Sequence, residues 1–506
     1  MSDSHSALHS RLLQLQSRFT WDLKDLMDLE NLSTRLQDHI ELQLGQRGAV
    51  ARSYSFLAYV RYLQDKPEEA VSILNQSQEK TRDCYGEENE QRLIVTYGDL
   101  AWLKYHTGDY KESETYCQRV NDILLNYPTG SSTVLHPEVY GEKAWTYLKF
   151  SRSYYPKAID CFCKALELQP DDSEWNAGLA IALYRTESAG SETSQESEES
   201  PATKQLRRAL EINPDDGVLM SMLALKLAAY QKHQEAEDLI ERALKTDPDN
   251  PHVTRYIAKY LRSKDEIERS IGLLEKALKR TSQSAFLHHQ LALCYKKKKI
   301  DEQRKPSNNQ RVKQWRRLCI QHLEEAVKIK PSFLLAIAEL ALLYGEEKDF
   351  SRYSVCLFGS GFLFKGLIIV FSFSFSFRAE EWFQQGLKML ESESEKSISQ
   401  VVHHRYAEFH FYHTKQEAKA INHYTQGLLL TSKTWESKRC AMKLKQIAER
   451  RISENESDGQ AFALLAVVAK AEDDKRKAAE LYEKALDCDE DNDEYLSALC
   501  MLRMEL

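Results

Sequence analysis

The chain reads RALEINPDD from Arg208 to Asp216 and, 34 residues later, RALKTDPDN from Arg242 to Asn250. The first part of this phrase returns as KALKR from Lys276 to Arg280, again after 34 residues. Three copies of a similar sequence at one constant interval indicate a tandem repeat rather than chance similarity. The repeat therefore decides the fold class before any other feature is considered.

The residues of this phrase explain how one repeat ends and the next begins. A small alanine near the end of a helix lets the neighbouring helix approach, and the proline a few residues later stops the helix. The Asp or Asn that follows suits the N-cap of the next helix. A helix–turn–helix unit of 34 residues is the tetratricopeptide repeat. We predict an all-α tetratricopeptide-repeat superhelix, an α-solenoid, in which each unit buries its apolar face against its neighbours.

Other copies of the phrase and the intervals between them set the domain organisation. KALELQPDD (Lys164 to Asp172) precedes the three regular copies at a longer spacing, because an acidic stretch at 188–201 intervenes. We expect that stretch to be a disordered loop. The chain then divides into an N-terminal helical segment (1–50), N-terminal repeats (51–250), central repeats with a basic loop at 296–311 (251–353), an anomalous apolar insert (354–378) and C-terminal repeats (379–506).

The apolar insert SVCLFGSGFLFKGLIIVFSFSFSFR, from Ser354 to Arg378, interrupts a repeat. A membrane span is one interpretation because the run is long and apolar, but it holds three glycines and Lys365 and would split a helical hairpin. A structured insert is a second interpretation. We favour a retained intron, because alternating Phe and Ser codons can spell the pyrimidine tract that precedes a splice acceptor.

Composition argues against several classes of protein. The net charge of −8, from 69 basic and 77 acidic residues, requires any anion site to be a local patch. The ten cysteines include the pair Cys161 and Cys163 but no zinc-binding spacing. The N-terminus MSDSHSALHSRLLQLQ lacks the apolar core of a secretory signal, so we expect a cytoplasmic protein without a membrane segment.

Motifs of catalysis are absent from the sequence. It contains no phosphate-binding G-x-x-x-x-G-K-[ST] loop, no Rossmann glycines, no H-E-x-x-H and no G-x-S-x-G. His288–His289 and His403–His404 are poor chelates, because consecutive residues on a helix point about 100° apart. We therefore expect a binding protein with no catalytic residues, no metal site and no cofactor.

Several expected first helices carry cations and rings at i, i+3 or i+4 spacing, which places them on one helical stripe. A central basic groove or tunnel lined in this way suits single-stranded nucleic acid, since cations meet phosphates and rings stack on bases. The alternative is that the rings are core residues and the cations are solvated. The stripes comprise Arg35 with His39, Trp145 with Lys149, and Arg255 with Lys259 and Arg262, with Tyr256, His289 and Gln290 in phase.

Longer stretches resemble the interferon-induced proteins with tetratricopeptide repeats, a vertebrate family, over nearly the whole chain except the insert. They are RFTWDL (Arg18 to Leu23), FLAYVRYL (Phe56 to Leu63), VTYGDLAWLKYHTGD (Val95 to Asp109), EKAWTYLKF (Glu142 to Phe150), RYIAKYLR (Arg255 to Arg262) and FLHHQLALCY (Phe286 to Tyr295). The resemblance implies a cytosolic antiviral effector that holds the 5′ end of single-stranded viral RNA and keeps it from translation. It implies recognition of a triphosphate, or of a cap lacking 2′-O-methylation, without a required cofactor.

The resemblance also assigns roles to residues of this chain. Trp145 matches a tryptophan that stacks on a cap base, and Val218 stands where several members carry a tyrosine. His39 departs from the glutamine that is frequent at its position. The residues expected at the RNA 5′ end are Arg35, His39, Trp145, Lys149, Tyr155, Arg185, Arg255, Tyr256, Lys259, Arg262, His289 and Gln290.

Two questions stay open at the level of sequence. Tyr482-x-x-x-Leu486 resembles an element through which some members pair with themselves or with each other, but the same pattern occurs in ordinary second helices of repeats. The groove could also grip a peptide, which would make the protein a scaffold in innate immune signalling. A closed, deep pocket would favour RNA, and an open groove would favour a peptide.

Overall fold

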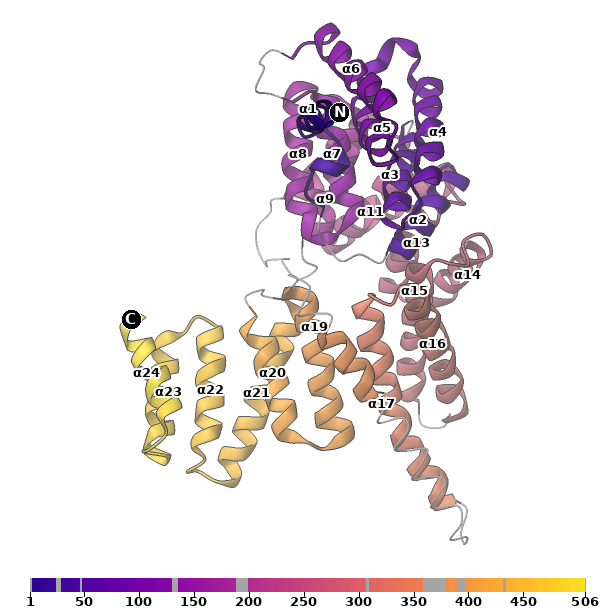
Figure 1. The fold of residues 1–506 in the computed structure, drawn as a ribbon. Coiled ribbons are helices and arrows are strands. Elements are labelled where there is room, and N and C mark those ends of the chain that lie inside the picture. Colours follow the sequence, from indigo (N-terminus) through magenta and orange to yellow (C-terminus); the bar gives the residue numbers. More distant parts are fainter. Residues whose placement is uncertain are drawn as a thin grey trace. The chain divides into compact units, whose positions relative to one another are not determined.

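The structure, a computed structural model, describes residues 2–23, 29–45, 48–129, 135–187, 199–305, 309–357, 379–388, 396–430 and 434–505. The chain forms two compact units. Unit 1 comprises Met1–Glu187, Gln195–Lys298 and Lys328–Pro331, and unit 2 comprises Ser188–Ser194, Lys299–Val327 and Ser332–Leu506. Within its described residues each unit consists of helices and connecting turns, so the predicted all-α class is confirmed (Figure 1).

The helices of unit 1 pack mainly in sequential antiparallel pairs, such as α3 with α4, α7 with α8 and α11 with α12. In chain order they are α1 (Ser2–Leu12), η1 (Arg18–Thr20), α2 (Leu29–Glu41), α3 (Ala49–Leu63), α4 (Pro67–Tyr85), η2 (Glu87–Leu93), α5 (Ile94–His106), α6 (Tyr110–Asn126), α7 (Pro137–Phe150), η3 (Arg152–Tyr154), α8 (Tyr155–Leu168), α9 (Ser173–Thr186), α10 (Pro201–Ile212), α11 (Gly217–Ala229), α12 (His233–Thr246), α13 (Pro251–Ser263) and α14 (Ile267–Leu278).

The boundary between the units falls within α15 (Ala285–Gln303) and α16 (Asn309–Ile329). In unit 2, α20 to α24 stand side by side (Figure 1) and pack pairwise in chain order. Its elements are α17 (Leu334–Leu357), a helix at 379–388, α19 (Lys396–Glu408), the π-helical turn η4 (Phe409–Thr414), α20 (Glu417–Leu429), α21 (Trp435–Glu454), α22 (Gly459–Ala471), α23 (Lys475–Cys488) and α24 (Asp493–Glu505).

The repeated phrase begins helices in the way its residues predict. Asp172, Asp216 and Asn250 are the N-caps of α9, α11 and α13, and each side chain accepts a hydrogen bond from a backbone N–H of the first turn. Such caps contribute about 1 kcal/mol each. The capped helices are the first helices of successive repeats, so the caps also fix the start of the face that carries the candidate site.

Small residues allow the helices to pack closely. Ala209 and Ala243 are buried. A Cβ added to Gly178 of α9 would lie 2.2 Å from Phe162 of α8, and one added to Gly141 of α7 would lie 2.2 Å from Trp175 of α9. Both glycines are therefore needed for close approach rather than for a turn. They bring α7, α8 and α9 together behind the candidate site.

The predicted basic loop at 296–311 is wrong. Lys296 to Gln303 continue α15, and α16 begins at Asn309. Lysine, glutamate and glutamine have good helix propensity. The mutual repulsion of the lysines is reduced because several of them pair with acidic residues. Lys297 pairs with Asp265 and Lys298 with Glu268.

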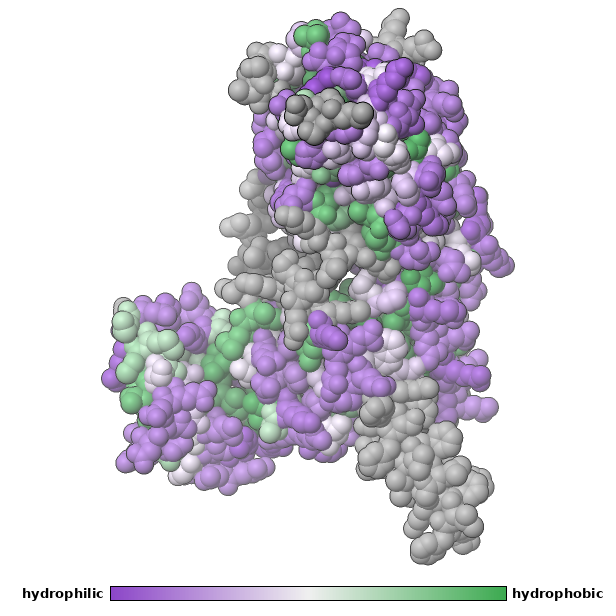
Figure 2. All heavy atoms as spheres, in the orientation of Figure 1, coloured by the Kyte–Doolittle hydropathy of each residue, from purple (hydrophilic) through white to green (hydrophobic). Residues whose placement is uncertain are grey.

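Of the predicted insert, Ser354 to Leu357 continue α17, and residues 358–378 lie outside the described residues. The origin of the insert stays a prediction. Among the described residues, no helix combines the length and apolar character needed to cross a bilayer. On the face drawn in Figure 2, hydrophilic residues cover most of the described surface, as expected for a molecule rich in charged side chains.

Candidate functional site

Unit 1 contains a cavity of about 430 Å³, lined mainly by the first helices of its repeats. This volume lies within the range of small-molecule and cofactor pockets. Five elements contribute most of the polar lining, namely α2, α3, α7, α9 and α13. Seven of the twelve residues predicted at the RNA end line the cavity, and they are Arg35, His39, Trp145, Lys149, Arg185, Arg255 and Tyr256.

Helical spacing explains why these side chains meet. Arg35 and His39 are four residues apart on α2, and Trp145 and Lys149 are four apart on α7, so each pair projects from one face. The same faces carry the buried leucines that pack between helices, including Leu36 and Leu148. Stacking of the repeats therefore brings the polar stripes of separate helices together around one cavity.

The cations of the cavity repel one another. Burial and the neighbouring Arg185 lower the pKa of Arg35 to about 10. Burial and Arg52 lower the pKa of Lys149 to about 7, although its ammonium donates a hydrogen bond to Ser53 Oγ at 3.1 Å. A cluster in which positive charge is this unfavourable is one that a bound anion would stabilise.

Tyrosine hydroxyls hold two of the guanidinium groups. Burial alone would lower the pKa of Arg185, but Tyr155 and Tyr256 interact with it and raise that pKa above its usual value. Arg255 donates a hydrogen bond to the Tyr256 hydroxyl at 2.7 Å, and its guanidinium carbon lies 5.2 Å from the centroid of the Phe286 ring. A phenol orients a cation without neutralising it, so the positive charge stays available to a ligand.

Trp145 forms one aromatic wall. Its ring meets Phe162 edge to face at 5.4 Å and lies 5.1 Å from the guanidinium carbon of Arg52. The indole Nε1 is buried and has no hydrogen-bond partner in the described part of the chain. The ring is only half-buried, so its position suits stacking on a planar group inside the cavity.

The remaining predicted residues lie outside the lining. Tyr155 interacts with Arg185 and Arg35 without lining the cavity itself, and Lys259 is exposed on α13. Arg262 donates a hydrogen bond to Gln290 Oε1 at 2.9 Å, and His289 is buried. These residues continue the stripe of α13 and α15 beyond the cavity.

Lining residues that were not predicted from the sequence include Arg52, Glu174 and His252. His252 could have been found, because it precedes Arg255 and Tyr256 by three and four residues on the same stripe of α13. Arg52 and Glu174 form an ion pair, and Glu174 also accepts hydrogen bonds from Gly48 N and the Tyr85 hydroxyl, both at 2.6 Å. No local pattern indicates this pair, since it joins α3 to α9.

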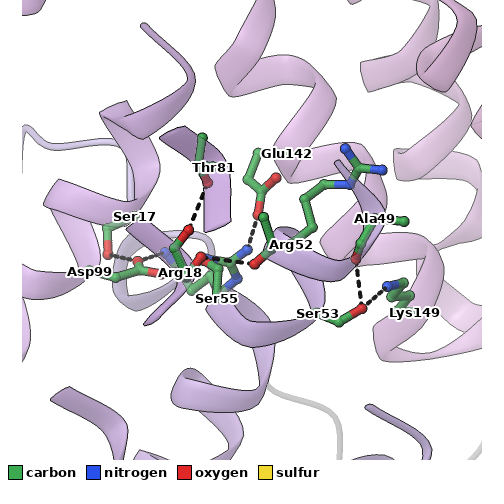
Figure 3. A network of polar contacts seen from close by, with 12 residues as sticks. Ser17, Arg18, Ala49, Arg52, Ser53, Ser55, Thr81, Asp99, Glu142 and Lys149 are labelled. Carbon is green, nitrogen blue, oxygen red and sulfur yellow. Dashed lines mark hydrogen bonds and ion pairs between the residues drawn. The ribbon is translucent and has the colours of Figure 1, made fainter. Parts of the chain in front are cut away.

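A second polar cluster lies beside the cavity (Figure 3), and its buried cation is paired with carboxylates of the chain. The buried guanidinium of Arg18 donates to Asp99 Oδ2 at 2.5 Å and to Ser55 Oγ at 2.8 Å, and it also pairs with Glu142. Burial alone would lower the pKa of Arg18, but Asp99 and Glu142 raise it. Ser17 donates to Asp99 Oδ1 at 2.6 Å. This network joins η1, α3, α5 and α7, and we call it the Arg18 network.

Groups of three or more His, Cys, Asp or Glu side chains able to hold a metal ion do not occur among the described residues. Tyr482, predicted to contact a partner, is buried between helices of unit 2, with its ring 6.4 Å from that of Tyr495. Leu486 is half-buried on the same helix, α23. The role of this pair in pairing between molecules stays a prediction.

Comparison with known proteins gives the same fold and a functional context. Residues 221–285 match the family model of the tetratricopeptide repeat. The human antiviral innate immune response effector IFIT1 is 31% identical, with 96% of each chain covered. Human interferon-induced protein with tetratricopeptide repeats 2 is 30% identical, with 96% of this chain and 97% of that protein covered. The solved human IFIT1 dimer with m7Gppp-AAAA matches with a TM-score of 0.81 and 30% identity over 96% of this chain and all of that one.

Proposed function

Because this chain belongs to the family of interferon-induced proteins with tetratricopeptide repeats, we propose that it binds the 5′ end of single-stranded RNA in the cavity of unit 1. The ligand class is RNA that begins with a triphosphate or with a cap lacking 2′-O-methylation. Retention of such an end by the protein would keep viral RNA from translation. The function involves binding alone, with no catalytic step, and its expected location is the cytoplasm.

One observation carries the proposal. Four cations, Arg35, Lys149, Arg185 and Arg255, line one cavity, and none of them forms an ion pair with a described carboxylate. Glu174, a carboxylate of the same lining, is occupied by Arg52, Gly48 and Tyr85. A chain of phosphates supplies the compensating charge, because charge-assisted hydrogen bonds to phosphate oxygens are strong and directional.

The aromatic walls favour RNA over a free polyphosphate. Trp145 and Tyr256 offer ring surface next to the cations, and stacking of a base on such a ring contributes about 1–3 kcal/mol. The related IFIT1 dimer was solved with m7Gppp-AAAA, a ligand that combines a base, three phosphates and a short RNA.

We also propose that the C-terminal helices pair two molecules. Leu496, Met501 and Met504 of α24 are exposed, and hydrophobic residues gather over the C-terminal helices on the face shown in Figure 2. The related IFIT1 structure is a dimer. Leu486→Glu is the appropriate test of pairing, because Leu486 is half-buried, whereas Tyr482 is buried and a glutamate there would disturb the packing of α23. A mass measurement in solution should show loss of a dimer, and an unchanged mass would remove this part of the proposal.

The RNA function is tested with one short RNA prepared with a 5′-triphosphate, an unmethylated-ribose cap, a 2′-O-methylated cap or a 5′-hydroxyl. Affinities are measured at one physiological salt concentration for the full chain and for a variant lacking residues 354–378. We expect the triphosphate end and the unmethylated-ribose cap each to bind at least about tenfold tighter than the hydroxyl end. The reason is that one charge-assisted contact contributes about 1.5–3 kcal/mol.

Equal, weak and salt-sensitive binding of all four RNAs would contradict the proposal, because it would show non-specific attraction to the backbone. The protein-scaffold alternative would then gain weight. Different behaviour of the two chains would show whether residues 354–378 belong to the working protein.

A further inference from the structure

Two histidines face each other inside the cavity. His39 of α2 and His252 of α13 bring their Nε2 atoms to 3.0 Å, with ring centroids 5.0 Å apart. They are 213 positions apart in the chain, and both line the cavity. At this distance one Nε2 must donate a hydrogen and the other must accept it, so the pair is neutral when both rings carry a single proton.

The charged neighbours of the pair are mainly cations. From α2, α7, α9 and α13 respectively, Arg35, Lys149, Arg185 and Arg255 act on one or both rings. Burial, together with these charges, lowers the pKa of both histidines well below the usual value. The other charged groups lining the cavity are Arg52 with Glu174, Tyr256, and the acidic residues Asp215, Asp216 and Asp247 at the repeat turns.

Those acidic residues have other contacts or lie at the rim. Asp216 caps α11, and Asp247 Oδ2 accepts a hydrogen bond from Asn250 at 2.6 Å. Asp215 is exposed. The lining residues by themselves thus disfavour a charged histidine, whereas an anion between α2 and α13 would reverse the sign of the local potential.

His39 also has an unused nitrogen. Its Nδ1 is buried and lacks a hydrogen-bond partner among the described residues. In the tautomer in which His39 donates through Nε2, Nδ1 holds a lone pair. A proton taken from the buffer would form an N–H bond there, and the resulting imidazolium could donate that hydrogen to a phosphate oxygen while its contact with His252 persists.

We propose that His39 and His252 select for a phosphate-bearing ligand end by accepting a proton as that end binds. This inference rests on the RNA-binding function proposed above and names the property of the RNA end that the pair detects. A 5′-hydroxyl end brings no charge to the pair and is bound without the proton. The two histidines are therefore determinants of specificity as well as of affinity.

The sign of the effect follows from linkage. The bound anion raises the pKa of the pair, so the complex holds more protons than the free protein between the two pKa values. Affinity for the phosphorylated end therefore rises as the pH falls through the pKa of the complex, and the gain is complete below the pKa of the free protein. One proton gives at most about a tenfold change in affinity per pH unit.

Two other groups titrate in the same range and must be separated. Lys149, with a pKa of about 7, gains charge as the pH falls. It does so in the parent and in His39→Gln alike, so its contribution cancels in their comparison. A 5′-triphosphate carries a terminal phosphate that also titrates, whereas a Gppp cap has no such group. The probe is therefore a short Gppp-capped RNA, with the 5′-hydroxyl RNA as its partner.

The experiment measures the affinity of both RNAs at pH 8 and pH 6 for the parent, His39→Gln and His252→Gln. Titration calorimetry in buffers of different ionisation enthalpy then counts protons taken up with the capped RNA. Glutamine retains a hydrogen-bonding side chain but cannot titrate. His233→Gln is the matched control, because His233 is exposed on α12 away from the cavity.

We expect the capped RNA to gain about tenfold more affinity between pH 8 and pH 6 in the parent and in His233→Gln than in His39→Gln. Proton uptake should be smaller in both cavity variants. Equal pH dependence and uptake in parent and His39→Gln, with the cap preference intact, would overturn the inference and leave the proposed function standing. No preference for the capped end at either pH would instead contradict the proposed function itself.

Discussion

The Arg18 network and the cavity lie side by side in unit 1 and treat buried positive charge in opposite ways. Arg18 has two carboxylates, from Asp99 and Glu142, for one guanidinium. Arg35 and Arg185 in the cavity have tyrosines and other cations around them instead. Both clusters are built on helices of the same repeats, so the fold alone does not explain the difference.

The comparison teaches how to separate a structural charge from one kept for a ligand. A buried ion that is paired within the chain contributes to one defined packing, and its loss leaves its partner uncompensated. A buried ion without a partner destabilises the free protein and becomes favourable only when an anion binds. Each of the following changes tests one side of this contrast.

The largest effect is expected from Arg18→Met. Removal of the guanidinium leaves Asp99 buried without its counter-ion, which should lower the free energy of unfolding by about 3–5 kcal/mol. Chemical denaturation followed by circular dichroism measures this loss. Arg11→Met is the control, since Arg11 pairs with Glu114 at the surface and such pairs contribute about 0–1 kcal/mol. Similar losses in the two variants would remove the distinction between network and surface.

Arg255→Met should weaken RNA binding without lowering stability, in contrast to Arg18→Met. We expect the affinity for 5′-triphosphate RNA to fall by about 1.5–3 kcal/mol, because charge-assisted contacts to phosphate are lost, while stability stays unchanged or rises. Affinity is measured by filter binding or fluorescence anisotropy, and stability by denaturation of the free protein. A variant that binds the triphosphate end as tightly as the parent would refute the assignment of the cavity.

Trp145→Ala tests the aromatic wall and should cost about 1–3 kcal/mol of affinity for capped RNA. The triphosphate RNA, which lacks the cap base, should lose less. Trp145→Phe keeps a ring against Phe162 and should recover part of the binding, which separates stacking from packing. Equal losses for the two RNAs would assign Trp145 to the core rather than to the ligand.

Lys149→Met should act on the free protein, raising its free energy of unfolding at pH 7, because burial and neighbouring cations disfavour the ammonium. Lys149 has a pKa of about 7 in the folded protein, below the ordinary value of the unfolded chain. The unfolded state therefore binds more protons between these values, and the stability of the parent should rise as the pH increases from 7 to 9. Urea denaturation at both pH values checks this, and a parent whose stability does not change with pH would contradict it.

The repeat could be predicted from the sequence because it is local. The phrase around Ala209 and Ala243 contains its own helix stop and its own cap. The loop predicted at 296–311 is wrong because lysine and glutamate are good helix formers, and here they continue α15.

Site residues that lie on one helix could be predicted from the sequence. Contacts between site residues on two different helices could not. Arg35 with His39 and Trp145 with Lys149 show the i, i+4 pattern. The Arg52–Glu174 pair joins positions 122 residues apart, and the contact between His39 and His252 spans 213. Such contacts depend on how the repeats stack, which no local pattern records.

The most direct test of the central claim is the salt dependence of binding for one RNA with a 5′-triphosphate and the same RNA with a 5′-hydroxyl. If the unpaired cations of the cavity hold the terminal phosphates, the triphosphate RNA should bind more tightly and its affinity should fall more steeply with salt. Arg255→Met should reduce that slope by about one. Identical affinities and slopes for the two RNAs would show that the cavity does not read the 5′ end.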